Sequence, residues 1–436
     1  MDPDALVVGG GFAGLATAAA LAESGARVKI LEQHHGPDSR FRGELIHPHG
    51  VRALERLGLV APLRRAGGVP VSGFVVVDDE GPEALLPYAR GKGSGLGIEH
   101  PTMVRTMREV VAARPRIELV VGRRALEPIR SGDRVVGVRD DGGVEHRAGL
   151  TIVADGSSSH LRKAIGLDAD VDLLSYMVAL AVTGDMLPHP GFGHVFLGGP
   201  GPILAYPFGP GAVRVCLDVP LDAPRGKAAL GRFVSGAYAA ALPGPIAAGV
   251  IAAADQGDFE VCANHRVHTR RCAVPGAVLV GDAGGCSHPL TATGMTCALH
   301  DAVALAETLA DGGPATYETR RYRFVRPREV LADAVYEVLG AADEGSRAMK
   351  RGIMRYWRGS ERARTRSIGI LSGEVSDTSA FVAEYTLVTG LAALGVWGGV
   401  VRAPALARRT RETRSLFRTA LGRIGETIRH TLGTTS

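Results

Sequence analysis

Cysteine is scarce in this chain, which has five thiols among 436 residues. So few cysteines in so long a chain exclude the disulfide framework of small secreted proteins and favour a reducing compartment. The first residues, MDPDALVVGGG, lack the basic and apolar segments of a secretory signal, so we expect no targeting peptide. Together these features predict a cytoplasmic protein.

Aromatic residues are also few, at 5% of the chain, while 22% of the residues are charged and 45% are hydrophobic. This balance is typical of a soluble globular protein, and the length allows two or three domains with a large core. A ligand pocket in such a chain would be lined mainly by leucine, valine, alanine and methionine. That lining suits an aliphatic or polycyclic ligand better than a charged one.

Positive charge is concentrated at the C-terminal end. Residues 402–436 contain eight arginines and two glutamates, a net charge of +6, whereas the whole chain carries +5. Residues 1–401 are therefore nearly neutral, which argues against a nucleic-acid-binding surface. Residues 385–401 carry no charge but reach only the lower limit of a membrane-crossing length, so we expect a buried or interfacial helix there.

A basic amphipathic helix is predicted beyond this apolar segment. Apolar residues recur at helical spacing among four arginines; they are Phe417, Leu421, Ile424, Ile428 and Leu432 among Arg414, Arg418, Arg423 and Arg429. Two interpretations stay open, a helix in peripheral contact with the inner face of a membrane and a helix that packs on the body of the protein. The first would give access to a lipid-soluble substrate.

The N-terminal segment carries a dinucleotide-binding pattern. An apolar strand at residues 5–8 leads into Gly-x-Gly-x-x-Gly, an alanine-rich helix follows, and a strand at residues 28–31 ends in an acid. The first glycine permits the tight turn, the second admits a pyrophosphate, the third lets the helix pack on the sheet, and the acid accepts hydrogen bonds from a ribose hydroxyl. The candidate binding residues are Gly9, Gly11, Ala13, Gly14, Glu32 and Gln33.

Two later strands also deliver an aspartate to a strand end. Residues 150–154 are apolar and precede Asp155 and Gly156, whereas residues 277–280 are apolar and precede Gly281 and Asp282. Ligands of open α/β sheets bind where the strands end. By itself, the first of these segments fits an ordinary strand-to-helix turn equally well.

The second aspartate opens the stretch GDAGGCSHPLTATGMTCALHDA, whose thiols and imidazoles imitate a zinc site. The four side chains are Cys286, His288, Cys297 and His300, and their spacing resembles that of zinc ligands. Cys297 and His300 fall on the helix expected after the loop, where a cysteine is usually a small packed apolar group. The Gly-Asp start and the Gly-Met-Thr centre instead indicate a loop that holds a cofactor, so we expect no metal site.

These three segments, in this order and at this spacing, resemble those of the FAD-dependent monooxygenases of the p-hydroxybenzoate hydroxylase type. A narrower resemblance is to the squalene monooxygenases and covers most of the chain. It is strongest in RFRGELIHPHG at residues 40–50 and HPLTATGMT at residues 288–296, with weaker matches in LLPYARG, HPTMVRTMR and GILSGE. The chain departs from that family at Ala292 and Thr293, where two glycines are usual, and at His47 and His49, where glutamine and glycine are usual.

The resemblance implies an α/β fold in three parts. Residues 1–70, 98–165 and 270–330 would form a Rossmann-like FAD-binding domain. Residues 71–97 and 166–269 would form an antiparallel-sheet substrate domain, in keeping with alternating runs such as VRVCLDVPL. Residues 331–436 would form a helical C-terminal region able to associate with a membrane.

The resemblance also implies roles for individual residues. The first motif would hold the adenosine diphosphate of FAD, Asp155 and Gly156 would lie near the flavin and NAD(P)H, and Gly281 and Asp282 would hold the ribityl chain. Tyr88 would lie near the substrate and the flavin. The remaining implied FAD contacts, in loops that surround the flavin, are Arg40, Arg105, Pro289, Gly294, Met295 and Thr296.

The implied reaction is the insertion of one oxygen atom from O2, through a flavin hydroperoxide, into a hydrophobic isoprenoid such as squalene or a prenylated aromatic. Since no second Gly-x-Gly-x-x-Gly follows a later strand, NAD(P)H would dock transiently or a separate flavin reductase would deliver the electrons. Alternatives on the same fold are an aromatic-ring hydroxylase of the ubiquinone or polyketide type and a prenyl reductase. A halogenase is disfavoured because its W-x-W-x-I-P motif is missing, and a lipid-binding flavoprotein without turnover is a further class.

Overall fold

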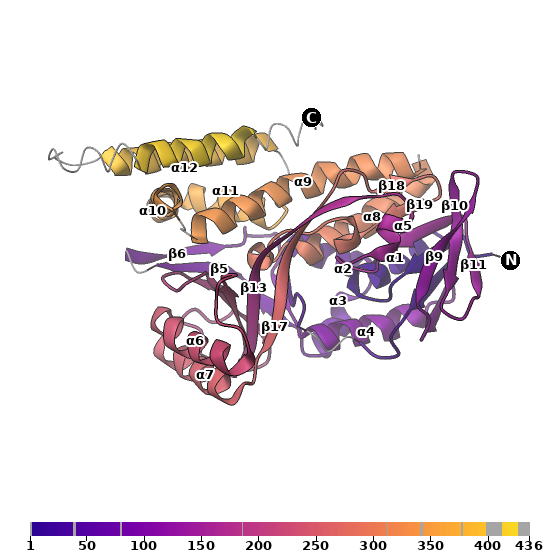
Figure 1. The fold of residues 1–436 in the computed structure, drawn as a ribbon, viewed down its shortest axis with the longest axis horizontal. Helices are drawn as coiled ribbons and strands as arrows, with labels where there is room; N and C mark the ends of the chain where they lie inside the picture. Colours follow the sequence, from indigo (N-terminus) through magenta and orange to yellow (C-terminus); the bar gives the residue numbers. More distant parts are fainter. Residues whose placement is uncertain are drawn as a thin grey trace.

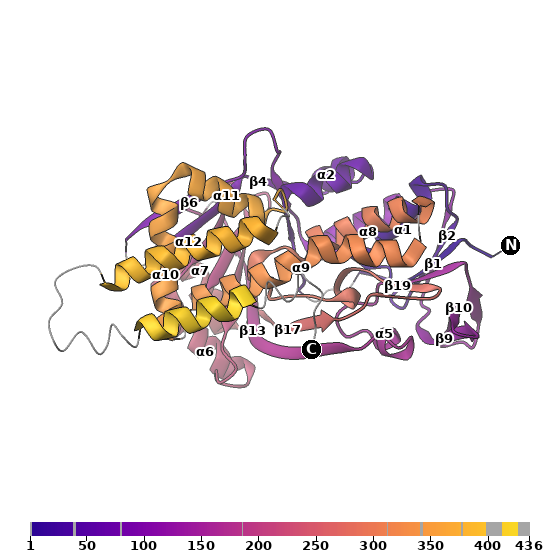
Figure 2. The same cartoon turned by 90° about the horizontal axis from the view of Figure 1, so that it is seen from above.

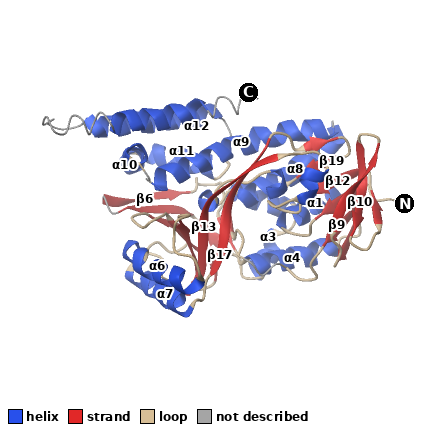
Figure 3. Ribbon diagram, in the orientation of Figure 1, coloured by secondary structure: helices blue, strands red, loops and turns tan. Residues whose placement is uncertain are grey.

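A computed structural model of the chain describes residues 2–37, 41–78, 81–184, 186–311, 313–340, 343–375, 378–397 and 412–425. Two sheets lie side by side, and a layer of helices from the C-terminal part covers one side of the molecule (Figure 1). Figure 3 shows that strands and helices alternate in the first part of the chain, whereas the last part is helical. The predicted combination of a Rossmann-like α/β unit, a second sheet and a helical C-terminal region is confirmed.

The first sheet has six strands in the order β18-β19-β12-β1-β2-β8. They are β1 (Ala5–Val8), β2 (Val28–Glu32), β8 (Ile117–Val121), β12 (Leu150–Val153), β18 (Ala273–Val274) and β19 (Ala277–Leu279). Strand β12 lies between β1 and β19 and is parallel to both. Because parallel neighbours end at the same edge of a sheet, the loops after β1, β12 and β19 are adjacent although they are far apart in the sequence.

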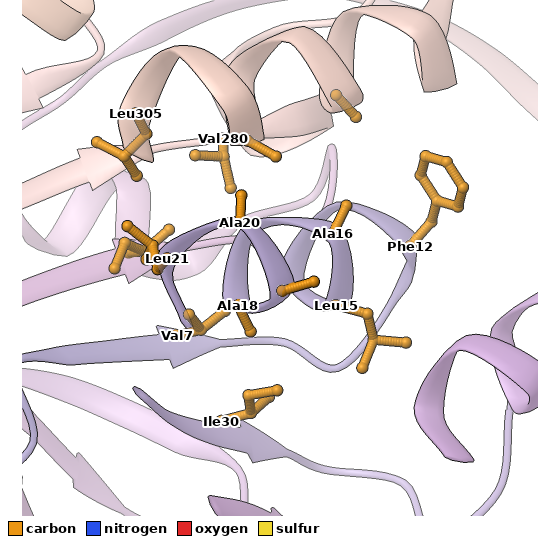
Figure 4. Close-up of a cluster of buried hydrophobic side chains, with 14 of the residues drawn as sticks. Val7, Phe12, Leu15, Ala16, Ala18, Ala20, Leu21, Ile30, Val280 and Leu305 are labelled. Carbon is orange, nitrogen blue, oxygen red and sulfur yellow. The ribbon is translucent and has the colours of Figure 1, made fainter. Parts of the chain in front are cut away.

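Helix α1 (Phe12–Glu23) packs on this sheet through small side chains. Its alanines are buried, and Figure 4 shows Ala16 and Ala20 facing α8 (Gly294–Asp311), near Leu305 and Val280. Alanine lets two helices approach closely, so α8 lies directly against α1. Figure 4 also shows Val7 and Ile30 of the sheet below α1, which joins the βαβ unit into one core.

Smaller elements complete this half of the molecule. The helices are α2 (Pro48–Arg56), α3 (Val60–Arg65), α4 (His100–Ala112) and α5 (His160–Ala164). One three-stranded sheet contains β9 (Ala125–Ser131), β10 (Arg134–Asp140) and β11 (Glu145–Arg147), and another contains β3 (Leu45–Ile46), β4 (Val69–Val71) and β7 (Gly95–Gly97).

The second large sheet has seven strands in the order β17-β13-β16-β15-β14-β5-β6. They are β5 (Gly73–Asp78), β6 (Gly81–Pro87), β13 (Ala169–Thr183), β14 (Gly193–Phe196), β15 (Ile203–Gly209), β16 (Ala212–Val219) and β17 (Glu260–Thr269). Its pairs are antiparallel except for β14 with β5, which is parallel. Helices α6 (Lys227–Ala237) and α7 (Gly244–Gln256) lie against the face away from α9 to α12 (Figure 1).

Two long strands connect the sheets. The ladder of β13 with β17 extends from Glu260 to Thr269, directly before β18 of the first sheet. Val267 exchanges backbone hydrogen bonds with Cys286 at 2.8 and 3.0 Å, and the Thr269 hydroxyl donates to the Gly284 carbonyl at 2.6 Å. The second sheet is thus hydrogen-bonded directly to the loop after β19.

Four helices form the C-terminal layer, namely α9 (Gly313–Gly340), α10 (Glu344–Gly359), α11 (Glu361–Leu371) and α12 (Thr378–Trp397), and residues 412–425 are also helical. Helix α12 crosses α10 closely, since a Cβ at Gly352 would lie 2.9 Å from the Val388 carbonyl oxygen. Figure 2 shows α12 and the last helix running beside each other across α10. The last helix buries Leu416 and Ala420, whereas Phe417 and Leu421 of the predicted apolar stripe are exposed. Ile428, Arg429 and Leu432 lie outside the described residues.

A buried ion pair fastens the first half of the chain to the second sheet. Glu44 precedes β3 and accepts two hydrogen bonds from Arg214 of β16, at 2.8 and 2.9 Å, and one from the Tyr206 hydroxyl at 3.4 Å. The guanidinium also lies 4.3 Å from the ring centroid of Phe208. Burial raises the pKa of Glu44, and the Arg214 charge opposes that shift. The pair therefore holds the segment around Glu44, which leads into β3, against the second sheet.

Replacement of Glu44 by glutamine should destabilise the protein strongly. Glu44→Gln leaves the Arg214 guanidinium buried without a counter-charge, so we expect a loss of about 3–5 kcal/mol in the free energy of unfolding, measured by urea denaturation. The double variant Glu44→Gln/Arg214→Met should recover part of this loss. Glu145→Gln, which breaks an exposed ion pair with Arg139, should have little effect. A Glu44→Gln variant as stable as the Glu145→Gln control would contradict the assignment.

Candidate active site

Two glycines of the first loop are required by close packing. Gly9 has a φ of +107°, and a Cβ there would lie 2.4 Å from the carbonyl oxygen of Ala154. A Cβ at Gly14 would lie 1.9 Å from the carbonyl oxygen of Gly9. Gly11 differs, because no other described part of the chain lies within 4 Å of its Cβ position. Open space therefore faces the first amide groups of α1, where a phosphate binds favourably.

Glu32 is held beside this loop. Its Oε2 accepts a hydrogen bond from the Gly10 amide at 2.6 Å, and its Oε1 accepts one from the His34 amide at 2.7 Å. A carboxylate oxygen can accept more than one hydrogen bond, so each Glu32 oxygen can still accept one from a ribose hydroxyl. This geometry supports the role proposed for Glu32, whereas the adjacent Gln33 is exposed and makes no contact that assigns it a role.

A buried ion pair shapes the turn at Gly281 and Asp282. Asp301 Oδ2 accepts hydrogen bonds from the Gly281 amide at 2.9 Å and from Arg321 Nε at 3.1 Å. Burial raises the pKa of Asp301 to about 6, and the Arg321 charge opposes the shift. Gly281 has a φ of +57°, and a Cβ there would lie 2.6 Å from the Cβ of Ala13 on α1. The turn is therefore pressed against the first helix, and Asp282 follows β19 at the strand end.

Two carboxylates lie at adjacent strand ends. Both oxygens of Asp155 are buried and accept no hydrogen bond of good geometry, and burial raises the pKa of this carboxyl against the opposing effects of Ser159 and His160. Asp282 is exposed at the end of β19. Desolvation by the surrounding protein raises the pKa of its carboxyl, and the charges of Arg42 and Arg321 oppose this rise. Buried acceptors require donors. A polyhydroxyl chain such as the ribityl group of FAD supplies them, so the residues present fit FAD at these strand ends.

The late loop ends at the start of α8. Its first turn, η3 (Pro289–Thr291), begins with a proline, and Ala292 follows with a φ of +51°. This backbone conformation costs an L-residue about 1–2 kcal/mol, which the glycine usual in the related family avoids. Gly294 then begins α8, is exposed and has nothing within 4 Å of its Cβ position. The start of α8 is therefore open at Gly294, in keeping with a flavin contact there, whereas Thr296 is buried and its hydroxyl accepts a hydrogen bond from the His47 amide at 3.3 Å.

Tyr88 belongs to a buried hydrogen-bonded chain that reaches the late loop. The two nitrogens of His47 lie 2.7 Å from the Tyr88 hydroxyl and 2.9 Å from the carbonyl oxygen of Thr291. Burial lowers the pKa of His47 to about 4, so the ring is neutral at physiological pH. A carbonyl can only accept, so Nε2 carries the proton and Nδ1 accepts from Tyr88. His47, which the sequence marked only as a departure from the family, thus fixes both the tyrosine and the loop.

The arginine nearest the glycine loop is Arg108. It donates to the carbonyl oxygens of His35 at 2.9 Å and of Gly10 at 3.5 Å, and its Nε is buried without a partner. Arg105 lies on the exposed face of α4 and donates to the Thr102 hydroxyl at 3.2 Å. The geometry favours Arg108 over Arg105 as a cofactor contact. The sequence alone does not show which face of α4 is turned toward the glycine loop. Arg40 lies outside the described residues.

The cysteines and histidines of the late loop are dispersed. His288 lies 2.9 Å from Asp218 Oδ1 and stacks on Tyr336 with ring centroids 3.9 Å apart. Cys297 and His300 lie on α8, as predicted, and His300 stacks on Phe324. Burial raises the pKa values of the Cys286 and Cys297 thiols. In the described part of the chain, no three His, Cys, Asp or Glu residues are grouped as metal ligands.

An apolar cavity adjoins the late loop. It encloses about 990 Å³ of space not filled by atoms, which includes its open mouth. Its walls come from β5, β6, β14, η3 and helices α9 to α12; they include Phe74, Val76, Leu86, Val195, Leu290, Thr291, Leu331, Val335, Val338, Met349, Trp357, Ile368, Phe381 and Val388. The lining has the aliphatic character expected from the composition.

Comparison with known proteins identifies the family. A family model for squalene epoxidase matches residues 147–397, and squalene epoxidase erg1 of Aspergillus fumigatus is 30% identical over 379 residues, covering 81% of this chain and 79% of the relative. The chain belongs to the squalene epoxidase family. A model for the NAD(P)-binding Rossmann-like domain matches residues 7–60. Squalene epoxidase erg1 of Schizosaccharomyces pombe is 25% identical and covers 95% of both chains.

Solved structures share the fold at lower sequence identity. The p-nitrophenol 4-monooxygenase PnpA from Pseudomonas putida DLL-E4 superposes with a TM-score of 0.72 at 22% identity, covering 86% of this chain and 98% of that one. PqsL, a probable FAD-dependent monooxygenase from Pseudomonas aeruginosa, superposes with a TM-score of 0.63 at 20% identity, covering 84% and 99%. This squalene epoxidase family member is therefore an FAD-dependent monooxygenase, with FAD as its cofactor and NAD(P)H as its electron source.

A side chain at Gly11 should block the cofactor and spare the fold. Gly11→Leu places atoms in the open space before α1, so we expect FAD affinity, measured by titration of the apoprotein, to fall at least tenfold. The thermal midpoint of the apoprotein should change little, because no described atom lies near this Cβ. Gly236→Leu adds the same side chain at another open position, on α6, and should bind FAD like the wild type. Unchanged FAD affinity in Gly11→Leu would contradict the site.

Neutral His47 should make stability depend on pH. Its pKa falls from 6.5 to about 4 on folding, so the unfolded chain binds a proton between these values that the folded chain does not. Stability is therefore lost as the pH falls from about 6.5 to about 4. His47→Gln keeps a hydrogen-bond donor and an acceptor but does not titrate. Over this pH range its free energy of unfolding should therefore decrease by roughly 3 kcal/mol less than that of the wild type.

Urea denaturation at several pH values between 7 and 4 measures this difference. His160→Gln provides the control, because His160 is exposed and its Nε2 donates one hydrogen bond, to the Ala125 carbonyl oxygen. The control should follow the pH dependence of the wild type. If His47→Gln follows it as well, His47 is not buried as a neutral ring.

Proposed function

We propose that the enzyme inserts one oxygen atom from O2 into a hydrophobic isoprenoid substrate, as an epoxidase of a squalene-like or prenylated aromatic alkene. The observation that carries the proposal is the apolar cavity, whose wall includes Leu290 and Thr291 of the loop that would border the flavin. Relatives named squalene epoxidase support an alkene as the reacting group. Nearly all of the cavity wall is aliphatic or aromatic, which suits a hydrocarbon chain better than a polar substrate.

The chain's own residues would bind, orient and dry the reacting groups. When bound, FAD supplies the oxygen-activating chemistry, so no nucleophile or paired carboxylates are needed from the protein. The apolar lining excludes water, and the neutral His47 holds the Tyr88 hydroxyl and the Thr291 carbonyl in fixed positions. Such positioning favours transfer of oxygen to a substrate over loss of the activated oxygen to water.

Membrane contact is proposed for the C-terminal layer. One helix in the described part, Ser379–Val396, is long and apolar enough to cross a bilayer, with a mean hydropathy of 1.5, but 39% of it is buried inside the protein. Leu387 and Leu394 of α12 are exposed, as are Phe417 and Leu421 of the last helix beside it. Exposed apolar side chains next to the basic C-terminal segment support peripheral binding to an anionic membrane, such as the inner face of the cell membrane. A separate flavin reductase stays an alternative to direct use of NAD(P)H.

Oxygen labelling tests the proposed reaction. The FAD-loaded enzyme, supplied with NAD(P)H and a flavin reductase under ¹⁸O2, should add one ¹⁸O atom to an alkene of squalene or of a farnesylated phenol, as measured by product mass spectrometry. A ring-hydroxylated product with the alkenes intact would favour the aromatic hydroxylase instead. Turnover without O2 that saturates the alkenes would favour a prenyl reductase. Absence of label from every isoprenoid tested would refute the proposal.

A further inference from the structure

The apolar cavity contains one acidic side chain. Glu384 lies on α12, is 7% exposed and lines the cavity together with Ser367 of α11. All other described lining residues are apolar except Thr291 and Tyr385. A carboxylate in an apolar wall is costly unless its oxygens are hydrogen-bonded. Its hydrogen bonds therefore indicate what the cavity is shaped to hold.

The Glu384 carboxylate interacts with Ser367, Arg366 and Tyr356, but only one of its oxygens accepts a hydrogen bond of good geometry. Oε1 accepts a hydrogen bond from the Ser367 hydroxyl at 2.9 Å, and Ser367 in turn accepts one from Trp357 Nε1 at 2.9 Å. Oε2 is buried and accepts no hydrogen bond. Arg366 Nε lies 3.3 Å from Oε2, an ion pair that supplies charge but no hydrogen bond. A buried, charge-paired oxygen with free lone pairs is thus left beside the cavity.

The neighbouring Tyr385 shows the same feature. Its hydroxyl is buried without a hydrogen-bond partner, and the side chain also lines the cavity. Burial and the nearby charge of Glu337 raise its pKa, so the hydroxyl keeps its proton. The part of the wall formed by α12 therefore carries an unused acceptor and an unused donor, whereas the wall at Leu290 is apolar.

These two groups lie away from the reacting end of the cavity. Leu290 and Thr291 belong to the late loop under the first sheet, whereas Glu384 belongs to α12, which packs on α10 and lies in the outermost helical layer (Figure 1). A substrate that fills the cavity would place one end at the late loop and the other end near Glu384. The distal end would then lie near Glu384 Oε2, which is ion-paired with Arg366 but accepts no hydrogen bond.

We propose that the substrate is an isoprenoid with a hydroxyl group, alcoholic or phenolic, at the end remote from the oxidised alkene, and that Glu384 accepts a hydrogen bond from it. The inference rests on the proposed function and specifies its substrate class. With a pure hydrocarbon bound, Oε2 keeps its ion pair with Arg366 but accepts no hydrogen bond, whereas a terminal hydroxyl would donate one. Glu384 is thus a specificity-determining residue, which selects the substrate and fixes the alkene that is oxidised.

Matched substrates test this selection. The probes are a farnesylated phenol, its methyl ether, which has the same skeleton without the donor, and squalene. We expect the FAD-loaded wild type to convert the phenol with a kcat/KM roughly tenfold to a hundredfold above that of the ether, as for a hydrogen bond to a charged acceptor. The label from ¹⁸O2 should lie on the alkene farthest from the phenol.

Two variants assign the preference to Glu384. Glu384→Met removes the acceptor and should abolish the preference for the phenol over its methyl ether. Glu384→Gln keeps the shape of the side chain and a neutral acceptor, so a preference of a few fold should remain. This variant replaces Glu384→Met in the test if the methionine variant does not fold. Glu307→Gln makes the same change in an exposed carboxylate paired with Arg56 and Arg320 and should leave the preference unchanged.

The outcomes separate this inference from the proposed function. Equal conversion of the phenol, the ether and squalene by the wild type would overturn the inference and leave the monooxygenase activity intact. A preference that persists in both Glu384 variants would overturn it as well. Absence of ¹⁸O from all three probes would refute the proposed function, and the inference with it.

Discussion

The parallel pairing of β12 with both β1 and β19 is the constraint on which the active site depends. It brings three loops that are distant in the sequence to one edge of a sheet, where each contributes a different group. The loops approach so closely that Gly9 meets the carbonyl of Ala154 and Gly281 meets Ala13. Gly9, Gly14 and Gly281 therefore serve packing between segments, whereas Gly11, Gly156 and Gly294 have open space at their Cβ positions.

Buried polar groups hold the rest of the structure in place around this edge. Asp301 with Arg321, Glu44 with Arg214, and His47 between Tyr88 and Thr291 each join segments that lie far apart in the chain. Such groups are costly to desolvate and contribute little net stability compared with apolar side chains of the same size. Their value here is geometric, because each holds particular atoms of distant segments at hydrogen-bonding distance.

The sequence predicted those parts of the molecule that depend on local patterns. The strand limits at residues 5–8, the order of the three loops and the helical C-terminal region follow from glycine spacing, apolar runs and a family resemblance. It assigned Arg105 to the cofactor, whereas Arg108 lies beside the glycine loop in the structure, because the orientation of α4 is set by distant segments. It treated His47 only as a departure from the family and did not single out Glu384, since burial and missing hydrogen bonds arise only from tertiary packing. The parallel pairing of β14 with β5 was also missed, because register between remote strands leaves no local signal.

The ladder of β13 with β17 affects how the whole protein unfolds. It extends from the second sheet to the loop after β19, and Val267 and Thr269 are hydrogen-bonded to that loop. Cofactor and substrate regions therefore share one continuous framework, without a flexible linker between them. Loosening of either region would strain the other, so the two should melt in a single cooperative transition. The boundary between the two regions therefore separates their chemical roles. It does not divide the chain into two parts that would fold independently.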